Sequence, residues 1–158
     1  MLRPLPAFPS ICIERLAAEH VLETTAWDVS RLTTQLCERT VELTVADLRR
    51  IADATEVLVA ISDDGAYAHI VGMVCLVWMP LPQGLRLLVE SFVVDVDHRG
   101  TGIASTLMDA VARRAEAEGV SHISLTCNPK REAAQAFYRT AGFTAAATAV
   151  LRKPVQGR

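Results

Sequence analysis

The sequence has few aromatic residues, no excess of positive charge and no long apolar run. Aromatic residues make up 5% of the 158 residues, and 16 basic against 18 acidic side chains give a formal net charge of −2. A nucleic-acid-binding domain usually carries a basic excess, so the charge disfavours that class without excluding it. The longest apolar stretch, residues 70–79, contains Gly72 and is shorter than the roughly 20 residues that cross a bilayer. The sequence therefore predicts neither nucleic acid nor a membrane as a partner.

Cysteine and histidine are also scarce, and their spacing fits no metal site. The cysteines form no CxxC pair, and the histidines show no HxxxH or HExxH spacing. The N-terminus lacks the apolar core of a secretory signal. We therefore expect a cytoplasmic chain with reduced thiols and no metal ion.

The remaining composition is that of an ordinary globular domain. Apolar types make up 51% and charged types 22%, and no repeat or Gly/Ser linker interrupts the chain. At roughly 150 residues per domain, the length predicts one domain over residues 1–158. Its first ten residues are rich in proline and are expected to be extended.

Apolar periodicity predicts the elements of the first half. Residues 11–15 alternate as a strand does, and residues 25–37 carry the period of a helix. Thr44 and Asp47 resemble a capping box that starts a second helix, with Asp in place of Glu. Three apolar runs separated by turn residues, at 57–61, 69–79 and 85–94, are predicted to be consecutive antiparallel strands.

The second half changes to a four-residue period. It predicts a helix from Ile103 to about Gly119, a strand at 120–127, a helix that starts at Asn128-Pro129 and ends at Gly142, and one or two strands within 143–151. The order of elements indicates an α/β fold of the α+β type. We expect a mixed, mostly antiparallel sheet of about six to seven strands, with about four helices on both faces.

A glycine-rich loop lies between the strand at 85–94 and the helix that follows. Gly100 and Gly102 allow a ligand to approach the backbone, and helix N-terminal amides bind anions. The Walker pattern is absent, and Ser105 stands where a Rossmann fingerprint has its third glycine. Taken alone, the loop fits either a phosphate site or a tight turn without a ligand.

Two longer segments resemble a known family. VESFVVDVDHRGTGIA at residues 89–104 and NPKREAAQAFYRTAGF at residues 128–143 are similar to the GNAT superfamily of N-acetyltransferases. Within them, Arg99-x-x-Gly102-x-Ala104 matches the acyl-CoA signature of that superfamily. The resemblance is specific over about residues 56–143, and it implies an enzyme that uses acetyl-CoA.

The resemblance implies where coenzyme A binds. Backbone amides of the loop would hold the pyrophosphate, helped by Ser105 or Thr106 from the first helical turn. The end of the preceding strand would bond the pantetheine arm as a missing strand does, and an amide there would polarise the thioester carbonyl. Asn128 either contacts the cofactor or caps the last helix. The implied cofactor-binding residues are Phe92, Val93, Val94, Arg99, Gly100, Thr101, Gly102, Ile103, Ala104, Ser105 and Asn128.

Two side chains are expected to carry protons during acetyl transfer. Glu90 is the only ionisable residue between Leu87 and Val94, and partial burial would make its carboxylate a better base for an ammonium group. Tyr138 matches the tyrosine with which the family protonates the leaving thiolate. The alternatives are a solvated or ion-paired glutamate and a tyrosine that only packs in the core.

The resulting prediction is an N-acetyltransferase. It moves the acetyl group of acetyl-CoA to a primary amine of a small molecule by direct attack in a ternary complex, and the chain forms a homodimer. The alternatives are an acetyltransferase for protein Lys or N-termini, and a non-catalytic acyl-CoA-binding module. The acceptor would be set by the first two helices and the loop at 80–84. An acyl-enzyme on Cys127 is disfavoured because buried thiols are usually inert, and Trp78 either packs structurally or lines the acceptor cleft.

Overall fold

The computed structural model describes residues 10–63 and 67–155. The chain divides after Thr126 into two compact units. The first holds β1 (Ser10–Arg15), the short 3-10 helix η1 (Ala18–His20), α1 (Glu23–Cys37), α2 (Val45–Ala54), β2 (Glu56–Asp63), β3 (Ala68–Leu81), β4 (Gly84–Val94), the 3-10 helix η2 (Val96–His98), α3 (Ile103–Ala117) and β5 (Ile123–Leu125); the second holds α4 (Glu132–Thr140). The extended segment predicted at residues 1–10 lies outside the described residues, except that Ser10 begins β1.

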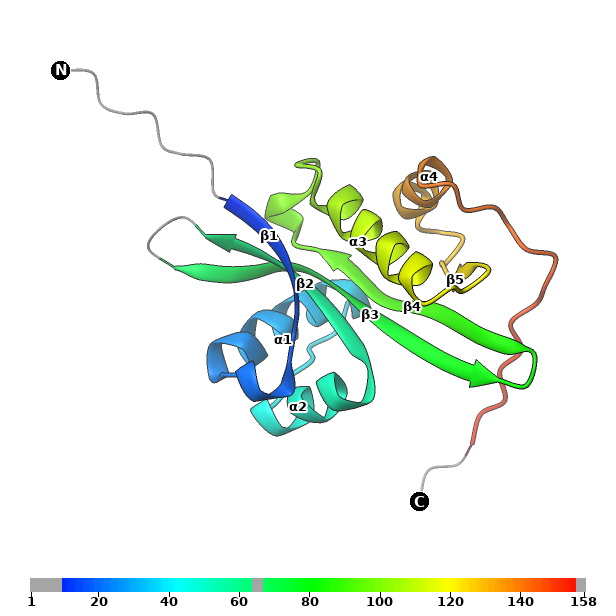
Figure 1. The fold of residues 1–158 in the computed structure, drawn as a ribbon. Helices are drawn as coiled ribbons and strands as arrows, with labels where there is room; N and C mark the ends of the chain where they lie inside the picture. The colour runs from blue at the N-terminus through cyan, green and yellow to red at the C-terminus, as the bar shows by residue number, and fades with distance from the viewer. Residues whose placement is uncertain (1–9, 64–66, 156–158) are drawn as a thin grey trace. The chain divides into compact units, whose positions relative to one another are not determined.

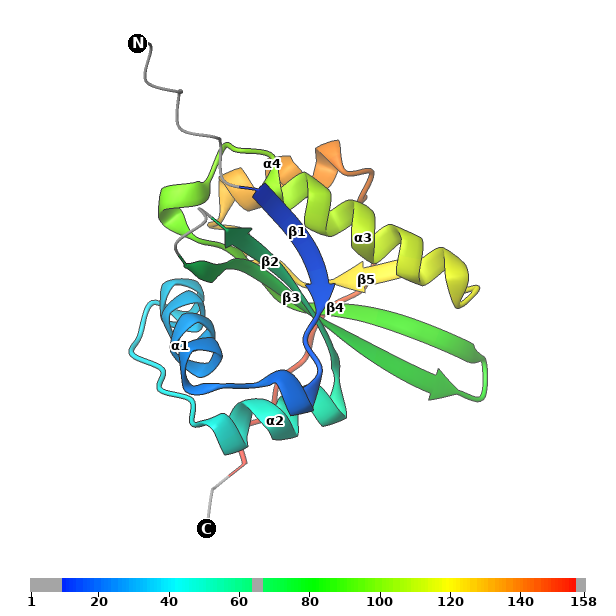
Figure 2. The same ribbon diagram turned by 60° about the vertical axis from the view of Figure 1, so that its left-hand side comes forward.

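The first unit is built on one sheet with the strand order β1-β2-β3-β4-β5. Strands β1 to β4 pair with one another in antiparallel fashion, and β5 pairs with β4 in parallel. Helices α1 and α2 cover one face of this sheet and α3 covers the other (Figures 1 and 2). The predicted mixed, mostly antiparallel α+β fold is therefore confirmed.

Apolar stripes on the helices explain this layering. The four-residue stripe predicted on α3 is buried along its whole length, at Ile103, Leu107, Val111 and Ala115. On the opposite face, α1 and α2 bury a second cluster against the sheet, with Leu32 and Leu48 almost fully buried. Burial of these side chains from water is the main driving force for packing the helices on the sheet.

Helix α2 begins at the capping box that the sequence predicted. The Thr44 hydroxyl accepts a hydrogen bond from the Asp47 amide at 3.1 Å, and the Asp47 carboxylate accepts one from the Thr44 amide at 3.1 Å. The shorter aspartate thus replaces the usual glutamate.

No helix among the described residues has the length and apolar character needed to span a membrane.

Near the C-terminus, the strand predicted at 120–127 forms only as the short β5, and the strands predicted within 143–151 do not form. Within the described residues the sheet has five strands rather than six or seven, and β5 covers only three of the eight residues predicted at 120–127. The Val120 amide bonds to the Ala115 carbonyl, which keeps Val120 in the turn that ends α3. Residues 143–151 form no strand, and this segment is rich in alanine, which strands disfavour.

Candidate functional site

A β-bulge in β4 sets the geometry of the site. Cys75 pairs with Glu90 and Met73 pairs with Val93, so that Ser91 and Phe92 together lie opposite Val74. Ser91 takes the left-handed conformation, with φ of 52°, although it is not a glycine. A bulge of this kind bends the strand and increases its twist. It therefore redirects β4 just before the glycine loop.

Beyond the bulge, β4 and β5 part. Their parallel ladder joins Leu87–Val89 to Ile123–Leu125 and, within the first unit, goes no further along β4. The Asp95 amide donates to the Val71 carbonyl at 2.8 Å, so the alternation of an antiparallel ladder turns the polar groups of Val94 away from β3. The Val94 carbonyl accepts a hydrogen bond from Arg99 Nε at 3.2 Å. The end of β4 thus directs the Val94 amide to the side where an extended ligand would pair.

The glycine loop follows directly and is open. Gly100 and Gly102 have φ of 75° and 88°, values that L side chains rarely adopt. A Cβ added to either would meet no atom within 4 Å. The Thr101 hydroxyl donates to the His98 carbonyl at 2.6 Å and so ties the loop back to η2. This open space beside the backbone leaves room for the pyrophosphate group that the resemblance implies here.

The N-terminus of α3 completes the loop. Gly102 is the N-cap residue and has no side chain to bond the first amides of the helix. The Ile103 side chain is buried and anchors the helix in the core, whereas Ser105 is exposed. Ile103 can therefore contribute to cofactor binding only through its backbone. The Thr106 hydroxyl bonds to the Gly102 carbonyl at 3.1 Å, which leaves Ser105 as the better placed of the two predicted hydroxyls.

Glu90 lies on the α1/α2 face of the sheet. It stands opposite Cys75, which packs against the buried cluster of that face. Glu90 is exposed, so the partial burial expected for it is wrong. Burial, with the Glu90 carboxylate nearby, raises the pKa of Cys75 to about 11. Cys75 is consequently a protonated thiol at neutral pH rather than a nucleophile.

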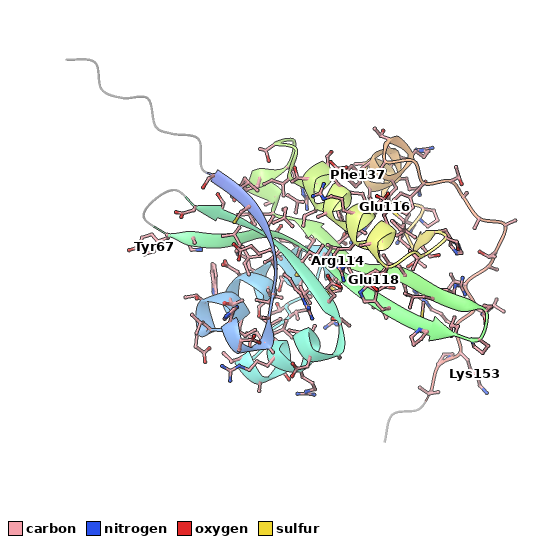
Figure 3. All side chains as sticks on the ribbon, viewed as in Figure 1. Tyr67, Arg114, Glu116, Glu118, Phe137 and Lys153 are labelled. Carbon is pink, nitrogen blue, oxygen red and sulfur yellow. The ribbon has the colours of Figure 1, made fainter. Side chains whose placement is uncertain are left out.

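Tyr138 belongs to the second unit, where the end of α4 fixes it. Gly142, with φ of 90°, reverses the chain so that the Phe143 amide bonds to the Tyr138 carbonyl at 2.9 Å. The Tyr138 ring makes edge contacts with Phe143 and with Phe137, at centroid distances of 5.8 and 5.5 Å; Figure 3 labels Phe137 on α4. Burial, together with the nearby Cys127 thiol, raises the pKa of Tyr138 above its ordinary value. Its hydroxyl is thus a proton donor at neutral pH.

Asn128 does not cap the last helix. Its side-chain oxygen accepts the Lys130 amide at 2.9 Å, which is an Asx turn, and α4 starts only after Arg131. The Asn-Pro pair therefore forms a turn ahead of the helix instead of the predicted helix start. Asn128 is exposed, and the cofactor contact implied for it stays a prediction.

Several other side chains have structural contacts. The Trp78 indole donates to Glu56 at 2.9 Å, in agreement with a packing role. The four cysteines, all within the described residues, are free. No cluster of three metal-ligating side chains occurs in residues 10–63 and 67–155.

A pocket of about 240 Å³ lies between α1, β3 and η2, and Trp27, Arg31, His69 and His98 are among its lining residues.

Comparison with known families agrees with this geometry. Residues 21–143, more than half of the chain, match the acetyltransferase (GNAT) family. The chain belongs to the GNAT family. Its enzyme class is therefore that of an acyltransferase. A search of curated proteins gives no match.

Solved structures share the GNAT fold at low identity. An acetyltransferase from Trypanosoma brucei is 21% identical with a TM-score of 0.74, covering 92% of this chain and 100% of that one. An aminoglycoside acetyltransferase from an uncultured soil metagenomic sample is 19% identical with a TM-score of 0.78, covering 93% and 97%. A ribosomal-protein-alanine N-acetyltransferase from Brucella melitensis is 23% identical with a TM-score of 0.72, covering 91% and 99%.

Sequence reasoning about this GNAT chain missed two features of the site. The bulge at Ser91 carries no glycine or asparagine that would signal a left-handed residue. The ion pair between Arg31 and Asp95 joins α1 to the residue that follows β4. No local sequence pattern marks this pair, because its two residues lie far apart in the chain.

Proposed function

We propose that this acyltransferase transfers an acetyl group from acetyl-CoA to a primary amine of a small molecule. The observation that carries the proposal is the pairing of an open strand end at Val94 with a left-handed glycine loop, Arg99–Gly102, at a helix N-terminus. The strand end offers backbone groups to pantetheine, and the loop and helix offer amides to the pyrophosphate. One domain over the whole chain is part of this proposal, since the family match spans both units.

The proposed reaction is a direct attack in a ternary complex. Glu90, directly or through a water molecule, accepts the proton that the acceptor ammonium must lose. The amine nitrogen then bonds to the thioester carbonyl carbon, the carbon–sulfur bond breaks, and Tyr138 protonates the departing thiolate. The nitrogen loses its second proton as the amide forms, and this proton returns through water to the Tyr138 phenolate. The exposed position of Glu90 supports this role, because water and an acceptor can reach its carboxylate.

Two kinds of structural neighbour bear on the acceptor, and one of them favours a small molecule. Aminoglycoside acetyltransferases from soil metagenomic samples share the fold over nearly the whole chain. The ribosomal-protein-alanine N-acetyltransferase supports the alternative, a peptide N-terminus as acceptor. A screen of acetyl-CoA turnover, detecting free thiol with small amines, aminoglycosides and alanine-initiated peptides, separates the two. Saturable turnover with a small amine supports the proposal, and turnover with peptides alone replaces it with the alternative.

We also propose that the chain forms a homodimer. The exposed Val150, Leu151 and Val155 supply apolar area for a second copy to cover. Light scattering should give about twice the chain mass of 17.2 kDa at micromolar concentration. A monomeric mass there would contradict the dimer.

A further inference from the structure

Two side chains of α1 hold the segment that leads into the glycine loop. Arg31 Nη1 forms an ion pair with Asp95 Oδ2, and Gln35 Oε1 accepts a hydrogen bond from the Val96 amide at 3.0 Å. Asp95 is only 2% exposed. The chain therefore leaves β4 fastened to α1 before it reaches Arg99.

Asp95 also shapes the turn itself. Its Oδ1 accepts the Asp97 amide at 2.9 Å, and its carbonyl accepts the His98 amide at 2.9 Å. The two carboxylate oxygens are thus divided between η2 and Arg31. Since η2 ends at His98, whose carbonyl binds Thr101, the orientation of Asp95 is passed on to the loop.

Arg31 is a fixed anchor because its other contacts do not involve the loop. Its Nη2 donates to the Ile70 carbonyl at 3.1 Å and lies 3.5 Å from Asp28 Oδ1. Asp28 Oδ2 in turn accepts the Ile70 amide at 2.9 Å. Asp28 and Arg31 therefore bond both polar groups of Ile70, where the β2–β3 register shifts. These contacts hold the Arg31 guanidinium against β3 independently of the conformation of the glycine loop.

We infer that Arg31 is a positioning residue that, through Asp95, holds the pyrophosphate-binding loop in its binding conformation. The inference rests on the proposed coenzyme A site. Gly100 and Gly102 give the loop conformational freedom that a ligand would otherwise have to remove on binding. A clamp at the start of the loop lowers that cost in advance. Its effect should be confined to the part of the substrate that the loop contacts.

Two matched variants and two acyl donors test the inference. Asp95→Asn removes the acceptor for Arg31 while its remaining oxygen still accepts the Asp97 amide. Asp28→Asn is the control, since Asp28 is an equally buried partner of the same Arg31 but bonds Ile70 rather than the loop. The donors are acetyl-CoA and acetylpantetheine, which lacks the pyrophosphate and the nucleotide. Asp95→Asn should raise KM for acetyl-CoA about tenfold, with kcat and the KM for acetylpantetheine close to wild type.

The control variant, Asp28→Asn, separates an effect on the glycine loop from a general loss of stability. Asp28→Asn should leave the ratio of the two KM values at its wild-type level, even if it destabilises the fold as much as Asp95→Asn does. Equal changes for both donors in Asp95→Asn, or the same ratio in both variants, would overturn the positioning role. Should Asp95→Asn not fold, Arg31→Lys takes its place, because an ammonium group cannot reach Ile70 and both carboxylates together.

The proposed function fails in a different way. If the wild-type chain releases no thiol with any amine, the acetyltransferase proposal fails, and calorimetry with coenzyme A and pantetheine then carries the comparison. A selective loss of coenzyme A affinity in Asp95→Asn supports the inference there, and equal affinities in wild type and Asp95→Asn overturn it.

Discussion

Arg114 on α3 binds the carboxylate of Glu56 on β2 through two nitrogen atoms. Nε lies 2.6 Å from Oε1 and Nη2 lies 3.0 Å from Oε2. The guanidinium also stacks over the Trp78 ring at 5.7 Å and reaches Glu118 one helical turn further on; Figure 3 labels Arg114 and Glu118 on α3. Glu56 is nearly fully buried, so this pair ties α3 to the sheet at the end away from the glycine loop.

The ion pair predicts a pH dependence of stability. The Arg114 hydrogen bonds lower the pKa of Glu56 below its ordinary value of 4.5. A carboxylate with a depressed folded-state pKa contributes stability fully above the unfolded-state pKa and loses it as the pH falls through the folded-state value. The difference in unfolding free energy between wild type and Glu56→Gln, from urea titrations, should therefore be largest near neutral pH and shrink below about pH 4.5.

A control separates the buried pair from surface charge. Glu118→Gln removes the exposed partner of Arg114 and should cost under about 1 kcal/mol. Arg114→Met leaves Glu56 buried without its cation and should cost about 3 kcal/mol. A Glu56→Gln difference that stays constant from neutral to acid pH would contradict the account.

The glycine loop predicts a selective loss of cofactor binding. Gly102 and Gly119, at the two ends of α3, both have left-handed φ and open space where a Cβ would lie. Valine at either site should cost a similar strain of roughly 1–2 kcal/mol. Only Gly102→Val places its side chain in the proposed pyrophosphate site, so acetyl-CoA affinity by calorimetry should fall more than about tenfold, or 1.4 kcal/mol. Equal affinities in the two variants would remove the cofactor assignment.

Close packing of α3 on the sheet predicts a third effect. A Cβ on Gly72 of β3 would lie 3.1 Å from Leu107 Cδ1 and 3.3 Å from Ile103 Cγ2. Gly72→Ala should therefore destabilise the chain by about 1–3 kcal/mol in urea titrations. In the double variant with Leu107→Val, the smaller side chain leaves room for the new Cβ. The double variant should therefore lose less stability than the sum of the losses in the two single variants. If the losses of stability simply add, the contact between the new Cβ and Leu107 is not the cause of the destabilisation.

Local chemistry explains which elements the sequence could predict. The α3 stripe at Ile103 and Leu107 and the Thr44–Asp47 cap depend on residues close in sequence, and both appear as expected. The bulge at Ser91 depends on how β3 and β4 pair, so no local signal marks it. The Arg31–Asp95 pair likewise exists only once α1 has packed on the sheet.

The candidate site divides in the same way. The loop with Gly102 could be predicted, because glycines in the motif themselves indicate a left-handed backbone. The exposure of Glu90 depends on which neighbours the folded sheet supplies, and the expectation of burial failed for that reason. The helix-cap alternative for Asn128 was wrong because a side chain that caps a helix also closes an Asx turn, and only the backbone path selects between them.

The two proton carriers predict different pH–rate profiles. Tyr138→Phe keeps the ring and removes the donor, so kcat should fall by roughly 10²-fold with acetyl-CoA binding unchanged. Because burial raises the pKa of Tyr138, the wild-type donor stays protonated into the basic range. Glu90→Gln should recover part of its rate as the pH approaches the pKa of the acceptor amine, whereas Tyr138→Phe should not. A Glu90→Gln profile identical to wild type would make Glu90 a structural residue.

The central claim is direct acetyl transfer from acetyl-CoA to an amine, and a time course of thiol release tests it most directly. Wild-type protein is mixed with acetyl-CoA, with and without the best amine of the screen, while intact-protein mass spectrometry follows the chain. The account predicts release of coenzyme A thiol only with the amine present, one thiol for each acetylated amine, and a chain of unchanged mass. Amine-independent release with a stoichiometric acetyl group on the protein, or no release with any amine, would contradict it.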